Sequence, residues 1–134
     1  MSEGVFVDAS ALTAILLREP EANDLSSRLV GSQRRLTSAI ALYETALAVA
    51  SRKRVAVTES RSYALDLVHE TAIDVIDVTA EVGRLAIDAH LRYGKGTGHP
   101  AQLNMGDCFA YACAKAHGVG LLYKGDDFAH TDLA

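Results

Sequence analysis

A glutamate interrupts a helical pattern that is otherwise apolar nearly all round. Residues 38–52 are rich in Ala and Leu, and Glu44 lies near the middle of them. Its neighbours three and four positions away on a helix are all apolar: Ile40, Ala41, Leu47 and Ala48. Burying a bare carboxylate costs several kcal/mol, so such a group must be protonated, paired or bound to a cation. A distant ion pair, or a helix end that reaches water, is the structural alternative.

Other acidic residues share this unusual setting. Asp107 opens a second apolar helical pattern, Asp8 directly follows the apolar run 4–7, and Asp126 and Asp127 follow the last apolar run. Each has a structural explanation of its own. An Asp in the first turn of a helix is favoured by the free backbone amides, and an Asp beside Gly is usual in turns.

One hypothesis covers all of these acids: they converge to hold a divalent cation. Ligand sets made only of carboxylate oxygens select Mg²⁺ or Mn²⁺ over zinc. The five histidines show no ligand spacing, and the sequence has no phosphate-binding loop and no serine nucleophile motif. Cys108 and Cys113 are five residues apart on one predicted helix and are interpreted as core residues.

Short apolar runs alternate with helical patterns along the chain. Strands are predicted at 4–7, 33–37, 73–78 and 119–123, and helices from Ser10 and at 20–31, 38–52, 58–71, 79–94 and 105–117. This order predicts an α/β fold with a central, mostly parallel twisted sheet of about four to five short strands and helices on both faces. In such sheets ligands bind at the carboxyl ends of the strands, which is where Asp8 and Asp126 are expected.

Length and composition agree with a single domain over residues 1–134. The chain is 49% hydrophobic and 22% charged, which is typical of a globular protein. Its net charge of −4 excludes a protein that grips nucleic acid through bulk positive charge, although a local basic patch is compatible with it. Because the sequence has neither a membrane-spanning run nor a signal-peptide pattern, we expect a cytoplasmic protein that does not contact membranes.

The same acidic residues lie in motifs that resemble the PIN domain, specifically the VapC-type ribonuclease toxins of type II toxin–antitoxin systems. The resemblance spans essentially the whole chain. The matching segments, in order, are Phe6-Val7-Asp8-Ala9-Ser10-Ala11-Leu12, Thr37-Ser38-Ala39-Ile40 leading to Glu44, Leu103-Asn104-Met105-Gly106-Asp107-Cys108-Phe109-Ala110-Tyr111-Ala112, and Leu121-Leu122-Tyr123-Lys124-Gly125-Asp126-Asp127-Phe128 followed by Thr131-Asp132.

The resemblance implies an acidic active site. Its catalytic residues fall on Asp8, Glu44 and Asp107, with Asp126 preferred as the fourth acid and Asp127 as the alternative. Asp8 and Asp107 would be direct metal ligands, and Glu44 would bind the metal through water or orient the attacking water. Two further residues, Ser10 and Asn104, are expected to support these acids or contact the substrate.

The resemblance also implies a reaction and partners. It predicts a Mg²⁺-dependent endoribonuclease, with Mn²⁺ as a substitute, in which metal-activated water attacks a phosphodiester of RNA. A VapB-type antitoxin and a homodimer are the expected protein partners. The basic residues available to approach RNA are Arg34, Arg35, Arg52, Lys53, Arg54, Arg92, Lys95 and Lys124.

Two other functions compete with this one. The first is a haloacid-dehalogenase-like phosphatase with Asp8 as its nucleophile. That mechanism needs a second Asp two residues further on, where this chain has Ser10. The second is a non-catalytic interaction module in which the acids are helix caps only.

Overall fold

The computed structural model describes residues 3–134, and its elements alternate much as the sequence predicts. In chain order they are β1 (Gly4–Val7), α1 (Ala9–Leu16), α2 (Ala22–Val30), β2 (Arg34–Ser38), α3 (Ala39–Lys53), α4 (Val57–Glu70), β3 (Asp74–Ile76), α5 (Ala80–Tyr93), α6 (Met105–His117) and β4 (Gly120–Leu122).

The four strands form one parallel sheet in the order β3-β2-β1-β4. Phe6 of the inner strand β1 is paired with Leu36 of β2 and with Leu121 of β4. This confirms the predicted α/β fold and its parallel sheet, at the lower end of the expected strand number. With all strands parallel, the loops that follow them meet at one edge of the sheet.

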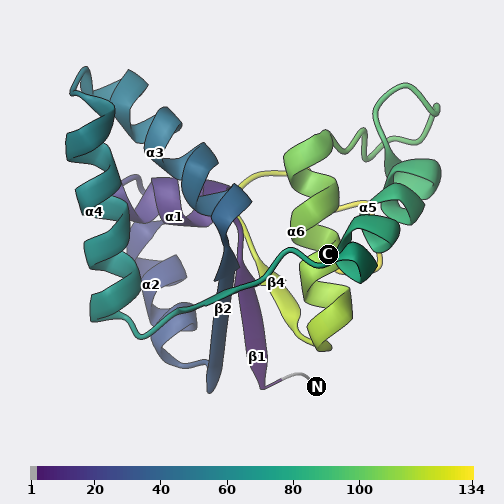
Figure 1. Cartoon of the computed structure of the whole chain (residues 1–134), viewed down its shortest axis with the longest axis horizontal. Helices are drawn as coiled ribbons and strands as arrows, with labels where there is room; N and C mark the ends of the chain where they lie inside the picture. Colours follow the sequence, from purple (N-terminus) through teal and green to yellow (C-terminus); the bar gives the residue numbers. More distant parts are fainter. Residues whose placement is uncertain (1–2) are drawn as a thin grey trace.

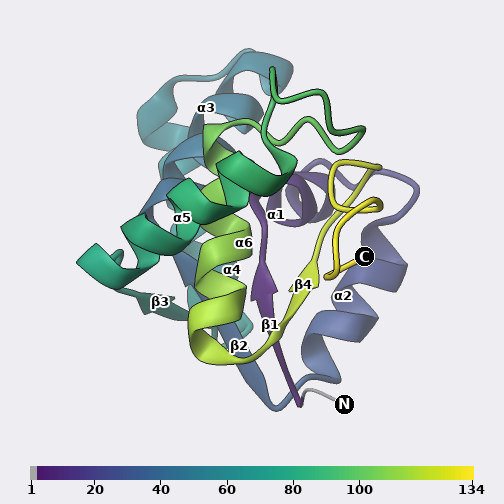
Figure 2. The same ribbon diagram turned by 90° about the vertical axis from the view of Figure 1, so that its right-hand side faces the viewer.

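Helices cover both faces of the sheet. Helices α1 to α4 lie on one side and α5 and α6 on the other (Figure 1), and Figure 2 looks onto the α5–α6 side. Successive residues of β1 point to opposite faces: Phe6 packs into the core cluster with α5 and α6, whereas Val7 packs into the cluster with α1 and α2. A strand buried on both faces reads as a continuous apolar run, as residues 4–7 do.

The third strand is shorter than predicted. The β-branched run 73–78 predicts six residues, but only Asp74–Ile76 pair with β2. This strand lies at the edge of the sheet, and its Val75 side chain is 48% exposed. With one neighbour and one open face, residues beyond the pairing segment gain no ladder hydrogen bonds to hold them extended.

Polar side chains begin four of the helices. The side chains of Asp8, Ser38, Thr79 and Asn104 accept hydrogen bonds from backbone amides in the first turns of α1, α3, α5 and α6. Such caps satisfy amides that have no partner within the helix. Within residues 3–134, no helix combines the length and the apolar character needed to cross a membrane.

Candidate active site

Three predicted acids meet near the carboxyl ends of the strands. Asp8 follows β1, Glu44 lies in the second turn of α3, and Asp107 lies in the first turn of α6. Burial raises the pKa of Glu44, and the charge of Asp8 adds to that rise. Burial also raises the pKa of Asp107, and the charges of Asp127, Asp8 and Glu44 add to it. The structure therefore brings together three carboxylates that are far apart in the sequence.

Ser10 anchors the Asp8 carboxylate through two hydrogen bonds. It is 6% exposed, and its Oδ2 accepts hydrogen bonds from the Ser10 backbone amide (3.1 Å) and the Ser10 hydroxyl (2.6 Å). The Ser10 hydroxyl in turn accepts a hydrogen bond from the backbone amide of Lys124, just beyond β4 (3.0 Å). Burial raises the pKa of Asp8, the hydrogen bonds from Ser10 oppose that rise, and the charge of Asp127 adds to it. Ser10 thus links the Asp8 carboxylate to the backbone beyond β4.

Asp107 is both a capping residue and a buried acid. Its Oδ2 accepts from the Asn104 amide (3.1 Å), while Asn104 Oδ1 accepts from the Asp107 amide (2.9 Å), which completes a capping box. Burial, followed by the charges of Asp127, Asp8 and Glu44, raises the pKa of Asp107 to about 7. A carboxylate has about four acceptor positions, so the cap leaves capacity for a cation.

Glu44 reaches the first turn of α6 because residue 106 is glycine. The Glu44 side chain is half-buried, and a Cβ at Gly106 would lie 2.2 Å from Glu44 Oε2. The Glu44 carboxylate thus occupies the space that any other residue at 106 would fill, directly beside Asp107. The role of Gly106 was not predicted. Its signal is a glycine inside a helical pattern, which usually has a packing or functional reason.

The turn after β4 offers two candidates for the fourth acid, Asp126 and Asp127. The neighbouring charge that contributes to the raised pKa of both Asp8 and Asp107 is that of Asp127, not of Asp126. Both residues are exposed in the turn after β4. Sequence alone does not distinguish between these adjacent acids, because the conformation of the turn determines which carboxylate faces the site.

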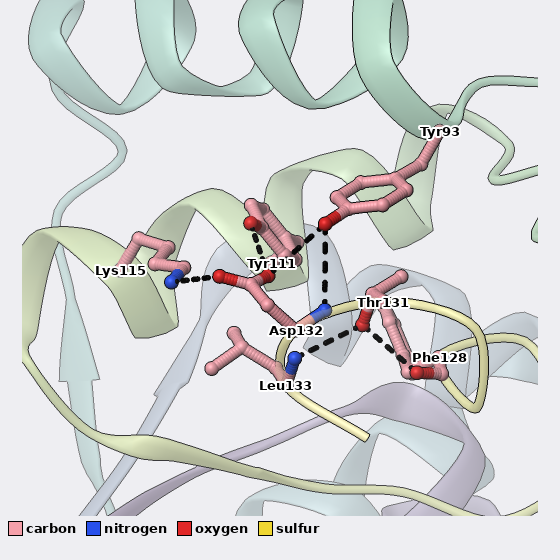
Figure 3. Close-up of polar contacts among 7 residues, drawn as sticks. All are labelled: Tyr93, Tyr111, Lys115, Phe128, Thr131, Asp132 and Leu133. Atoms are coloured by element: carbon pink, nitrogen blue, oxygen red, sulfur yellow. Dashed lines mark hydrogen bonds and ion pairs between the residues drawn. The ribbon is translucent and has the colours of Figure 1, made fainter.

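The segment that carries Asp127 is fastened to α5 and α6 by Asp132 (Figure 3). The carboxylate of Asp132 accepts hydrogen bonds from the hydroxyls of Tyr111 (2.5 Å) and Tyr93 (3.4 Å) and forms an ion pair with Lys115. Partial burial raises the pKa of Asp132, but the bonds from Lys115 and Tyr111 outweigh it and lower the pKa below its ordinary value. These contacts hold the C-terminal segment against the side of the molecule that bears Asp107.

The donor set suits a hard divalent cation. The converging groups are carboxylates, and Asp8 and Asp107 are anchored by hydrogen bonds as metal-binding carboxylates usually are. Across residues 3–134, no three acidic, His or Cys side chains already lie close enough together to enclose one ion. The thiols are unsuited to the task, because burial raises the pKa of Cys108 and takes that of Cys113 to about 11.

Comparison with known proteins gives one consistent result. The PIN domain family model matches residues 5–133. A VapC ribonuclease of Rhizobium meliloti is 41% identical over 139 residues, covering 96% of this chain and 98% of the relative. Ribonuclease VapC30 of Mycobacterium tuberculosis is 42% identical over 129 residues, covering 96% of this chain and 95% of the relative.

A solved structure supports the fold independently. The crystal structure of Mycobacterium tuberculosis VapC20, described as a sarcin-ricin loop cleaving toxin, superposes with a TM-score of 0.74. The match covers 97% of this chain and 96% of VapC20, at 19% sequence identity. The arrangement of helices and strands is thus shared even where most side chains differ.

Proposed function

This chain belongs to the PIN domain family, among the VapC ribonucleases, and on that premise we propose that it is a toxin that cleaves RNA with the help of a divalent cation. The observation that supports the metal-dependent mechanism is the placement of the three acids: the Glu44 carboxylate lies against Gly106, next to Asp107, near the edge of the sheet where Asp8 follows β1. Several buried carboxylates that face one another are tolerated when a cation offsets their charge. Mg²⁺, with Mn²⁺ as a substitute, fits an oxygen-only donor set.

Each acid has a proposed task. Asp8 and Asp107 would hold the cation directly, and Glu44 would bind it through water or orient the water that attacks the phosphodiester. A divalent cation held here would lower the pKa of bound water and offset charge on the phosphate. We assign the fourth acidic position to Asp127, with Asp126 as the alternative, because the charge of Asp127 acts on Asp8 and Asp107. Water as the nucleophile yields 5′-phosphate and 3′-hydroxyl ends.

The neighbours of these acids have supporting tasks. Ser10 fixes the Asp8 carboxylate through its hydroxyl, and Asn104 fixes Asp107 through the capping box. The Ser10 hydroxyl also occupies the place where a phosphatase of the haloacid-dehalogenase type needs a second Asp. We therefore prefer nuclease to phosphatase chemistry for this site.

We further propose the biological setting that the VapC relatives suggest. The chain acts in the cytoplasm as one domain over residues 1–134, and a VapB-type antitoxin restrains it. A homodimer would cover apolar side chains on α5 and at the start of α6, where Ile87, Leu91 and Met105 are 63%, 70% and 71% exposed.

An RNA cleavage assay tests the proposed activity. Purified protein is incubated with total bacterial RNA in Mg²⁺, Mn²⁺ or EDTA, and the end groups of the products are determined. We expect cleavage only with a divalent cation, and a loss of about 100-fold or more in Asp8→Asn and Asp107→Asn, because each removes charge that stabilises the transition state. Circular dichroism checks that both variants fold.

The exposed acid Asp24 of α2, 76% exposed at its side chain, supplies the control. Asp24→Asn changes net charge by the same amount and should retain full activity. Cleavage that survives in both site variants would refute the metal mechanism. Hydrolysis of small phosphate esters with intact RNA would favour the phosphatase instead.

A further inference from the structure

A pocket that contains basic side chains opens beside the acidic residues. Its volume is about 390 Å³, and it lies between α1, α3 and the turn after β4. Glu44 and Ser10 line the end that adjoins the candidate active site. Arg52 and Lys124 line the same pocket, together with Glu19. When one phosphate of an RNA strand lies at the acidic residues, the neighbouring phosphates lie close by. The pocket is therefore adjacent to the path of the RNA strand.

Helix α3 supplies one cation of the pocket. Glu44, Ala48 and Arg52 are spaced by four residues and line one side of it. From the helical rise, Arg52 lies about 12 Å along the axis from Glu44. Ala48 lies between them, and its small side chain leaves space in the middle. The helix therefore presents an acid at the reaction end and a guanidinium at the other.

The chain beyond β4 supplies the second cation. The backbone amide of Lys124 donates to Ser10 Oγ (3.0 Å), and that hydroxyl donates to Asp8 Oδ2 (2.6 Å). Two hydrogen bonds thus connect the Lys124 backbone to a proposed metal ligand. This connection fixes the position of the Lys124 backbone relative to the reaction site. Because no atom of the lysine side chain takes part, a substitution of that side chain leaves the connection in place.

In this structure Glu19 forms ion pairs with both Arg52 and Lys124. Its carboxylate contacts Arg52 Nη1 at 3.2 Å and Lys124 Nζ at 3.0 Å, and Glu21 lies 3.7 Å from Lys124 Nζ. The Arg52 side chain is 58% exposed, that of Lys124 31% and that of Glu19 21%, so the pair with Arg52 is near water and the pair with Lys124 is partly buried. An exposed ion pair contributes only about 0.2–1 kcal/mol, and a phosphate that displaces Glu19 restores a negative partner for both cations.

We propose that Arg52 and Lys124 form a subsite for an RNA phosphate next to the scissile one, and that Glu19 occupies this subsite until RNA displaces it. The inference rests on the proposed ribonuclease function and specifies how the substrate is bound. It also answers an electrostatic problem, because a chain of net charge −4 with an acidic reaction site repels RNA unless cations lie beside that site. Glu19 is thus a competitor of the substrate.

RNA binding measured without cleavage tests this subsite. The dissociation constant of a fluorescein-labelled single-stranded oligoribonucleotide is measured by anisotropy in EDTA over a series of KCl concentrations. Arg52→Gln and Lys124→Gln should each weaken binding about fivefold. Each should also reduce the slope of log affinity against log salt by roughly 0.7, since one phosphate contact is lost. Arg52→Lys, which retains the charge, should bind more tightly than Arg52→Gln.

The effect of Glu19→Gln has the opposite sign and is the most informative result. We expect RNA binding about two- to fivefold tighter, since the internal competitor is gone. Asp24→Asn makes the same charge change in an exposed ion pair with Arg28 on α2, and Arg28→Gln is the matched basic control. Both controls should change the dissociation constant by less than about twofold, as expected for surface substitutions.

The outcomes separate this inference from the proposed function. Unchanged binding in Arg52→Gln and Lys124→Gln overturns the subsite, even where the wild type cleaves RNA with Mg²⁺. Weaker binding in Glu19→Gln overturns the role of Glu19 as a competitor. If the two cations instead serve an acidic segment of a protein partner, RNA binding stays unchanged and the subsite is likewise refuted. Normal RNA binding with no metal-dependent cleavage refutes the ribonuclease function alone.

Discussion

Asp8 and Asp107 each cap a helix and also face other carboxylates. The cap fixes the carboxylate by hydrogen bonds, and burial together with like charges makes its ionised form costly. Helix capping therefore explains part of the setting of Asp8 and Asp107, but not all of it. Capping alone does not require a second and a third acid to approach the same residue.

The raised pKa values predict how stability depends on pH. Burial and neighbouring charge raise the pKa of Asp107 from 3.8 to about 7, and they raise the pKa values of Asp8 and Glu44 as well. Between pH 3.8 and about 7, the folded protein therefore binds more protons than the unfolded chain. Asp107 therefore contributes stability that is fully present below its ordinary pKa of 3.8 and is lost as pH rises through about 7. Thermal unfolding in EDTA should show this fall.

Two comparisons make the pH experiment specific. Asp107→Asn removes the titrating group and should flatten the fall in melting temperature, whereas Asp24→Asn should leave it unchanged. Adding Mg²⁺ should raise the melting temperature most at high pH, where the carboxylates are ionised and free to bind it. A melting temperature in EDTA that rises through neutral pH would contradict the raised pKa values.

The individual acids differ in how well sequence predicts them. Asp8, Glu44 and Asp107 stand out because each follows or interrupts an apolar pattern. The preference between Asp126 and Asp127 could not be drawn from pattern, since both occupy the same turn. Arg52 and Lys124 appear in the sequence only as surface cations, and their shared contact with Glu19 depends on tertiary structure.

Helices α3 and α6 form the acidic site by packing closely at one point. Gly106 allows this approach, because the carboxylate of Glu44 fills the position of its missing Cβ. The order and type of these elements follow from hydrophobic periodicity. Their close contact does not, because periodicity identifies the face that is buried but not the residue that faces it across the interface.

Gly106→Ala should therefore reduce activity more than stability. The added methyl group meets the end of a flexible side chain, so Glu44 moves aside and the fold survives. We expect cleavage to fall about tenfold or more, in line with the loss of a group that orients a metal site. The melting temperature should change by only a few degrees. RNA cleavage rates and thermal unfolding of the same samples provide the measurement.

Gly83 in α5 is the matched control, because a Cβ there meets no atom within 4 Å. Gly83→Ala should retain full activity and gain up to about 1 kcal/mol of stability from helix propensity. Full activity in Gly106→Ala would show that Glu44 need not lie against α6, and it would remove Glu44 from the mechanism.

At the scale of the whole molecule, the parallel sheet brings distant residues to one edge. The loops after β1 and β4 carry Asp8 and Asp127, and helices α3 and α6 bring the other acids alongside. Alternation of strands and helices predicts this topology, because parallel strands require crossover helices. The lengths of the strands were less predictable, as the short edge strand β3 shows, since pairing partners rather than propensity determine where such a strand ends.

Direct titration of metal-free protein with Mn²⁺ tests whether these carboxylates together bind one divalent cation. Isothermal titration calorimetry is carried out above the Asp107 pKa of about 7, without RNA. We expect saturable binding by the wild type and by Asp24→Asn, and affinity at least about tenfold weaker in folded Asp8→Asn and Asp107→Asn. Equal Mn²⁺ affinity in all four proteins, or no binding by the wild type, would contradict this expectation.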